Sequence, residues 1–199
     1  QLITPYPIEA GVAPIPYPPP YKLPKAGCGS KIATPDELTG TMTSGNWDEG
    51  IFPPEGVHEL ESGVYCLQDD FIVTEGQILE GGGVTIVMES GNIKISGKAE
   101  INLSAPKDGP NAGLLIYVPI GNHGVIFLNG SDESNYMGTI FAPGADLYIN
   151  GLDSTRSAAY HSQIIAYYIE VDGNDNIEMN YKDEQNWDTL TMPEVVLIK

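Results

Sequence analysis

A short apolar segment recurs five times along the chain and constrains the fold more than any other feature. The copies begin at positions 63, 83, 113, 138 and 162, so they are separated by 20, 30, 25 and 24 residues. They read GVYCL, GVTIVM, GLLIYV, GTIFAP and SQIIAY. Short apolar runs bounded by Gly, Asn, Asp and Ser, without a helical period, are typical of strands joined by turns.

A second apolar segment comes after each copy and ends in a polar residue and a glycine, at Gly76, Gly97, Gly130, Gly151 and Gly173. A third, looser segment closes most repeats, most clearly AEINL from position 99 and NIEMNY from position 176. Three strands per repeat predict an all-β fold, a right-handed parallel β-helix (solenoid) of about five coils that share one core. The glycines are predicted to form its tight corners. An antiparallel sandwich has strands of similar length and stays open as the alternative.

The chain divides into four predicted segments. Residues 1–27 form a Pro-rich extended arm, 28–62 an irregular capping region, 63–182 the solenoid and 183–199 a C-terminal cap with a strand at 195–198. Within the capping region, Thr34 as N-cap and Pro35 at the first helical position predict a short helix at 34–37. Within the solenoid, Ile86, Ile116, Ile140 and Ile164 are predicted to lie in the core.

The arm is unusually rich in proline, with eight of the sixteen prolines in the first 24 residues. Each proline fixes φ and removes a backbone donor, which excludes a helix or a central strand. We expect the arm to lie along a neighbouring subunit, as in assemblies built by strand addition. The apolar side chains available for this contact are Leu2, Ile3, Tyr6, Ile8, Val12, Ile15, Tyr17 and Tyr21.

The two cysteines, Cys28 and Cys66, stand 38 positions apart without a CxxC pair or a Cys/His cluster. This spacing gives no support to a zinc or haem site and favours a disulfide. A disulfide in turn predicts an extracellular or cell-surface location. Two unpaired buried thiols are the alternative.

The formal charge of −18, from 27 acidic against 9 basic residues, restricts the partners. Such a surface repels nucleic-acid phosphate and anionic lipid. No apolar stretch is long enough for a membrane span. We therefore expect a homopolymer or other surface proteins as partners, with carbohydrate as an alternative, and neither nucleic acid nor membrane.

One acidic segment begins like a calcium loop, with Asp172, Asn174, Asp175 and Asn176 as candidate ligands. It then departs from the EF-hand pattern, because Ile177 stands at the sixth position, where the turn needs glycine. No cofactor is predicted, and bound calcium is left as an alternative to a solvated acidic rim.

A polysaccharide lyase is the enzyme class that a parallel β-helix raises, and Asp153, Arg156 and His161 lie within nine residues of one another. A lyase needs a cation-binding carboxylate set and a base. A surface ion pair with a capping histidine explains these three residues more simply, and no enzymatic activity is predicted.

Several blocks over about residues 60–199 resemble the C-terminal β-repeat domain of bacterial Flp-type pilus-assembly proteins of the TadE/TadG-like kind. The blocks are GVTIVMESG, AEINLSAP, GPNAGLLIY, GTIFAP, ADLYING, HSQIIAY and QNWD. The resemblance implies an exported structural protein associated with pili or adhesion, with no catalytic residues to carry over. We expect a subunit of a pilus, filament or adhesive surface layer that assembles through its extended arm and its solenoid ends, with a carbohydrate- or surface-binding adhesin domain as the alternative.

Overall fold

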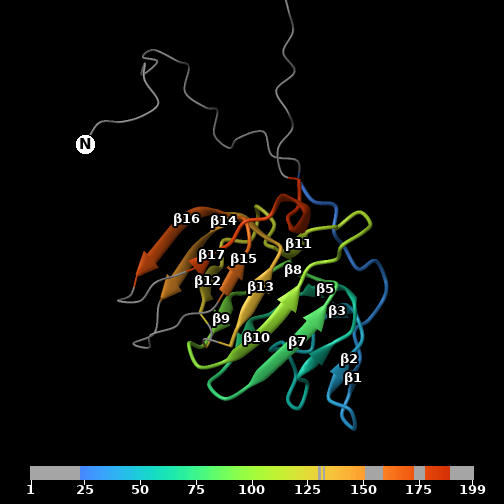
Figure 1. The fold of residues 1–199 in the computed structure, drawn as a ribbon. Helices are drawn as coiled ribbons and strands as arrows, with labels where there is room; N and C mark the ends of the chain where they lie inside the picture. The colour runs from blue at the N-terminus through green and yellow to red at the C-terminus, as the bar shows by residue number, and fades with distance from the viewer. Residues whose placement is uncertain (1–22, 130, 132, 151–158, 173–177, 189–199) are drawn as a thin grey trace, which may run out of the picture. The chain divides into compact units, whose positions relative to one another are not determined.

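The computed structural model describes residues 23–129, 131, 133–150, 159–172 and 178–188. These residues form seventeen strands and one short 3-10 helix, η1 (Asp183–Gln185), with no α-helix among them (Figure 1). No helix in this described part has the length and apolar character needed to cross a membrane. The predicted arm up to residue 22 and the predicted cap strand at 195–198 lie outside the described residues.

The strands stack in parallel as a β-solenoid of about five turns, as predicted, and every strand pairing is parallel except the one between β1 and β2. The antiparallel alternative is therefore wrong. We call the three sides of the solenoid the first, second and third faces. The first face contains β3 (Gly45–Trp47), β5 (Gly63–Leu67), β8 (Val84–Met88), β11 (Leu114–Tyr117) and the first parts of β14 (Thr139–Asn150) and β16 (Ile164–Asp172).

The second face contains β6 (Phe71–Val73), β9 (Ile93–Ile95), β12 (Val125–Leu128) and the later parts of β14 and β16. The third face contains β2 (Thr41–Met42), β4 (Glu59–Leu60), β7 (Ile78–Gly82), β10 (Glu100–Ser104), β13 (Asn135–Met137), β15 (Ala159–His161) and β17 (Glu178–Met179). Within the described residues, the predicted first strands of the repeats thus lie on the first face, the second strands on the second face and the third strands on the third face.

The core follows the register of the first face. Ile86 pairs with Ile116, and Ile140 on the next rung pairs with Ile164. Ile86, Ile116 and Ile140 are completely buried. Ile164 is half-buried because β16 is the last described rung of this face. The predicted core positions are therefore confirmed, and Ile164 marks the place where the core reaches an end.

In four coils a glycine with positive φ stands at the start of the first strand. Gly63, Gly83, Gly113 and Gly138 all have positive φ there, at 140°, 70°, 76° and 125°. A Cβ on Gly113 would clash with the backbone of Asn186, so a side chain does not fit. Of the predicted corner glycines after the second strand, Gly76 has positive φ and Gly97 does not, while Gly130, Gly151 and Gly173 lie outside the described residues.

The predicted short helix at 34–37 is wrong. Pro35–Asp36 forms strand β1, which turns back and pairs in antiparallel fashion with β2. The Asp36 carboxylate accepts a hydrogen bond from the Leu38 backbone N–H at 2.9 Å, and Gly40 closes the turn with φ of 69°. Asp36 therefore caps a hairpin turn where Thr34 was expected to cap a helix.

The parallel ladder also begins earlier than the repeats indicated. β2, β3 and β4 lie within residues 41–60, in the segment predicted to be irregular, and they pair with later coils. Each has only two or three residues, which is too short to show the alternation of a strand in the sequence.

Both ends of the described chain cover the outer side of the first face. Its outward row, from Cys66 through Val87 and Tyr117 to Phe141, is at most 8% exposed although it lies outside the core. Cys28 is bonded to Cys66 at one end of this row, and the Trp187 ring lies 5.8 Å from the Phe141 ring at the other. The solenoid therefore has a second, smaller apolar layer outside its core.

Candidate functional site

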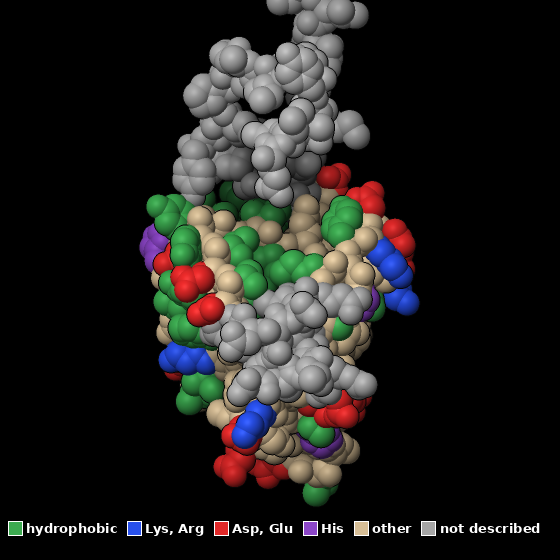
Figure 2. Space-filling model, turned by 60° about the vertical axis from the view of Figure 1, so that its left-hand side comes forward, with side chains coloured by type: hydrophobic (Ala, Val, Ile, Leu, Met, Phe, Trp, Pro, Cys, Tyr) green, Lys and Arg blue, Asp and Glu red, His purple; other side chains and the backbone are tan. Residues whose placement is uncertain are grey.

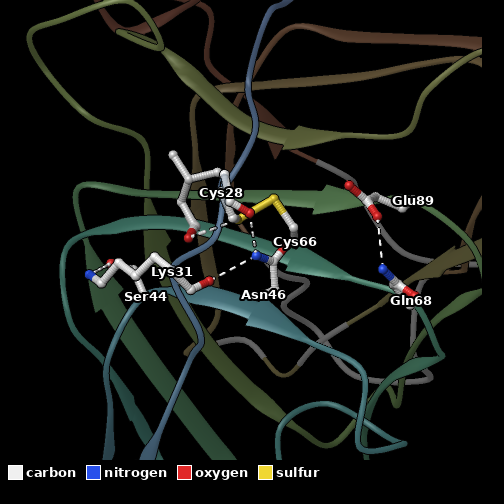
Figure 3. The surroundings of a disulfide bond; sticks show 9 residues. Cys28, Lys31, Ser44, Asn46, Cys66, Gln68 and Glu89 are labelled. Carbon is white, nitrogen blue, oxygen red and sulfur yellow. Dashed lines mark hydrogen bonds between the residues drawn. A yellow bond between two sulfur atoms is a disulfide. The ribbon is translucent and has the colours of Figure 1, made fainter.

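The disulfide predicted between Cys28 and Cys66 is present, with the two Cα atoms 6.0 Å apart (Figure 3). Polar contacts hold the residues after Cys28 against the first coil. The Asn46 side-chain amide donates to the carbonyls of Gly29 and Lys31, each at 2.8 Å, and the Lys31 ammonium donates to the Ser44 hydroxyl at 2.7 Å. This segment is therefore fastened to the solenoid by one covalent bond and several hydrogen bonds.

These contacts close the N-terminal end of the solenoid. Ile32 forms a parallel bridge with Asn46 next to β3, and β1 pairs with the edge of β2. Behind them Met42 and Phe52 are completely buried and Trp47 is 6% exposed. The core is covered at this end.

The C-terminal end is open by comparison. Leu147, Ile149 and Tyr160 are at most 1% exposed, but their partners on the last rung, Ile169, Val171 and Met179, are 43%, 53% and 47% exposed. Figure 2 brings this end of the molecule forward and shows hydrophobic side chains gathered in the middle of the face, with acidic side chains toward its margins. Among the described residues, the inward-facing row of the core thus ends in exposed side chains at this end.

The last described strand of the ladder lies at the same end. β16 is nine residues long and pairs with β14 along one edge, and no strand among the described residues pairs with its other edge. A long edge with exposed apolar side chains is a template for another strand. We call this region the open end; it comprises the outer edge of β16 together with Ile169, Val171 and Met179.

An aromatic row runs along the outside of the second face. The rings of Phe127 and Tyr148 stack with centroids 5.2 Å apart, and Tyr148 and Tyr168 lie 6.0 Å apart. Because Phe127 and Tyr148 turn their faces toward each other, their faces are occupied by the stacking. This row joins successive coils, and Phe127 and Tyr168 in it stay 37% and 47% exposed.

Hydrogen-bonded side chains form a second row, at the corner between the first and second faces. The Asp70 carboxylate accepts hydrogen bonds from the Asn92 backbone N–H at 2.8 Å and side-chain amide at 2.9 Å, and Asn92 in turn accepts from the Val125 N–H at 2.9 Å. Partial burial raises the pKa of Asp70, but these donors and the Lys94 ammonium outweigh it, so that the pKa lies below its ordinary value.

Three buried tyrosines have clear structural roles. The Tyr65 hydroxyl donates to the Met42 carbonyl at 2.7 Å and the Tyr160 hydroxyl donates to the Leu128 carbonyl at 2.8 Å, while the Tyr136 ring stacks on the Tyr160 ring. Burial raises the pKa of each of the three hydroxyls. They therefore remain neutral donors inside the core.

Two hollows indent the described part of the molecule. One, of about 180 Å³, is lined by Pro53, Gly56, Val57, His58, Val73, Gln77 and Ile78. The other, of about 230 Å³, is lined by Ser104, Ala105, Pro106, Lys107, Met137, Glu184 and Gln185. The second hollow brings the Ser104 hydroxyl, the Lys107 ammonium and the Glu184 carboxylate into one lining.

The remaining predicted site residues fall partly outside the described chain. All eight arm residues do, as do Asn174, Asp175 and Asn176 of the calcium candidate and Asp153 and Arg156 of the lyase constellation. Asp172 ends β16, and His161 ends β15 beside Met137. Among the residues that the structure describes, no three His, Cys, Asp or Glu side chains are placed to hold a metal ion.

The solenoid ends were predicted to assemble, but the exposure of Ile169, Val171 and Met179 was not, because the repeats show which residues point inward but not which coil is the last. Exposure of Ile169 and Val171 depends on whether another strand covers β16 in space. Comparison of the chain with protein-family models, with curated proteins and with solved structures found no match.

Proposed function

We propose that the protein is a non-enzymatic extracellular structural protein, a subunit of a pilus, filament or adhesive surface layer, and that it assembles through its open end and its N-terminal arm. The observation that carries this proposal is the exposed core at the C-terminal end of the solenoid, where Ile169, Val171 and Met179 are about half exposed. Apolar core side chains at a surface mark a contact with another chain.

The size of the open end indicates that a second contact is needed. Burying the exposed half of each of these three side chains contributes about 1 kcal/mol, or about 3 kcal/mol together. Association costs at least about 4 kcal/mol in lost translational and rotational freedom. The apolar arm supplies the additional contact area in our proposal.

The disulfide supports an extracellular location. A bond between Cys28 and Cys66 persists in oxidising compartments and is rare in the cytosol. An acidic surface, which favours solubility outside the cell, agrees with this location.

Deleting residues 1–24 tests the proposal, because the deletion leaves Cys28 and the whole described solenoid in place. The intact protein is expected to form polymers in negatively stained electron micrographs and in light scattering, and the truncated protein is expected to remain monomeric. Polymers of unchanged length and abundance after the deletion would exclude a role of the arm, and an intact protein that stays monomeric would exclude assembly altogether.

A further inference from the structure

We propose that the arm docks as an added β-strand on the outer edge of β16 in a second copy of the chain. This inference rests on the proposed function and specifies where and how the arm binds. It is carried by three properties of the open end and of the arm sequence: backbone geometry, side-chain spacing and charge.

The backbone of β16 offers a place for one more strand. β16 pairs with β14 from Ile140↔Ile164 to Asn150↔Asp172, with one bulge, and beside residues 169–171 no strand of the described residues pairs with the opposite edge. In a parallel ladder, the N–H and C=O of one residue point to one neighbour and those of the next residue point to the other. An added strand therefore needs donors only at alternate residues.

The prolines of the arm leave donors at alternate residues. In the segment PIPYP at 14–18, Pro14, Pro16 and Pro18 alternate with Ile15 and Tyr17, which keep their N–H groups. If the segment is extended, all of its donors lie along one edge and all of its prolines face the other. A strand with prolines on one edge is suited to the outside of a sheet and cannot be extended by further pairing.

The side chains of the same segment match the open end in spacing. Ile15 and Tyr17 lie two residues apart and so project from one face of an extended strand. Ile169 and Val171 are likewise two residues apart, and both pair with buried residues of β14. The strand can therefore place Ile15 and Tyr17 over these two exposed core side chains while its edge pairs with β16.

Charge favours the arm over a second open end as the partner. Within residues 1–21 the only ionisable acidic or basic side chain, apart from the tyrosines, is Glu9. The open end carries the exposed carboxylate of Glu170, and two such ends in contact would bring two copies of this charge together. At the N-terminal end β1 pairs with β2 and Ile32 forms a single bridge to β3, so the edges there are short compared with the nine residues of β16.

Two arm variants test the backbone argument in the full-length chain. Ile15→Pro removes a donor from the pairing edge, whereas Pro16→Ala restores one on the opposite edge and serves as the matched control. Hydrogen exchange of the β16 amides is expected to be at least tenfold slower in assembled wild-type protein and in Pro16→Ala than in Ile15→Pro.

Two surface variants test the side-chain argument. Ile169→Lys is expected to reduce assembly at least tenfold, measured as the protein concentration needed for half-maximal polymer in sedimentation velocity. Ile78→Lys is the control, because Ile78 is similarly exposed, at 46%, but lies on the third face. Unchanged thermal unfolding by circular dichroism shows that both variants are folded.

Cross-linking of a mixture of ¹⁵N-labelled and unlabelled chains identifies the copy that donates the arm. Heavy-to-light cross-links between the arm and β16 support the inference. Protected β16 amides with cross-links only within one chain would overturn the inference. Polymers that form equally well in Ile15→Pro and Ile169→Lys would also overturn it, but the proposed function would survive this second result. A chain that never assembles would exclude both the docking inference and the proposed function.

Discussion

Asp70 shows how single side chains hold successive coils together. Its carboxylate sits on one coil and binds two N–H groups of Asn92 on the next, while the Lys94 ammonium lies 3.4 Å away. Because these contacts favour the charged form, the pKa of Asp70 is lowered in the folded protein. The stabilisation is thus fully present above the unfolded-state pKa of about 3.8 and is lost as the pH falls through the lower, folded-state pKa.

We predict that Asp70→Asn lowers the free energy of unfolding by about 1 kcal/mol at neutral pH, since charge-assisted hydrogen bonds become neutral ones. The difference from wild type should shrink as the pH is lowered below about 4. Urea unfolding at a series of pH values measures it, with the exposed Asp48→Asn as control. A difference that is independent of pH would show that the charge of Asp70 is not responsible.

A substitution at Ile116 tests the packing of the core. It is completely buried between Ile86 and Ile140, so an aspartate there would create a cavity and bury a carboxylate without a partner. We predict that Ile116→Asp lowers the free energy of unfolding by roughly 3–5 kcal/mol. Ile78→Asp, at a side chain that is 46% exposed, should lower it by only about 1 kcal/mol. Equal losses in urea unfolding would contradict the assigned register.

At the scale of the elements, the disulfide joins the segment after Cys28 to β5 and so keeps the N-terminal end closed. Closing a loop of this length restricts the unfolded chain by roughly 4 kcal/mol in the entropic treatment. We predict that the double variant Cys28→Ser, Cys66→Ser loses stability of this order. Hydrogen exchange should be faster in β2 and β3 than in β10, which lies far from the bond in the coil order. Uniform exchange along the solenoid would refute this local effect.

The repeating elements could be predicted because each strand carries its own apolar run. GVTIVM, for example, becomes β8, whose five residues are all buried, and the spacing of the copies predicts their stacking. The elements near residue 40 could not be predicted, because β2 and β4 have two residues each and their pairing depends on neighbouring coils. The helix predicted at 34–37 failed because capping residues also favour turns, and Asp36 formed one.

One part of the candidate site could be predicted from the sequence and another could not. The pairing of Cys28 with Cys66 could be inferred because two cysteines allow a single intrachain bond. The open end could not, because Ile169 resembles Leu147 in its sequence context and differs only in having no described coil above it. Sequence identifies a core position, and the three-dimensional order of coils decides whether it is covered.

At the scale of the whole molecule, the two ends of the solenoid differ. At the N-terminal end β1, the Ile32 bridge and the disulfide lie over buried core residues, whereas at the C-terminal end of the described chain core residues of the last rung are exposed. Direct stacking of solenoids would need two matching ends. An arm that reaches from one copy to the open end of the next provides a contact that repeats without closing, and such contacts build filaments.

Assembly of these subunits must act against their charge. Each chain carries −18, so bringing copies together is opposed by repulsion that salt screens. We predict that polymer formation weakens when ionic strength falls from about 0.15 M to about 0.01 M, where the Debye length grows from about 8 Å to about 30 Å, and that removing calcium at low salt weakens it further. Sedimentation velocity with calcium, with magnesium and with a chelator measures both effects. If magnesium replaces calcium fully, charge screening is sufficient for assembly. If only calcium restores the polymers, assembly requires a calcium site such as the one predicted from Asp172 to Asn176. Polymers that strengthen at low salt would contradict an assembly driven by apolar contact.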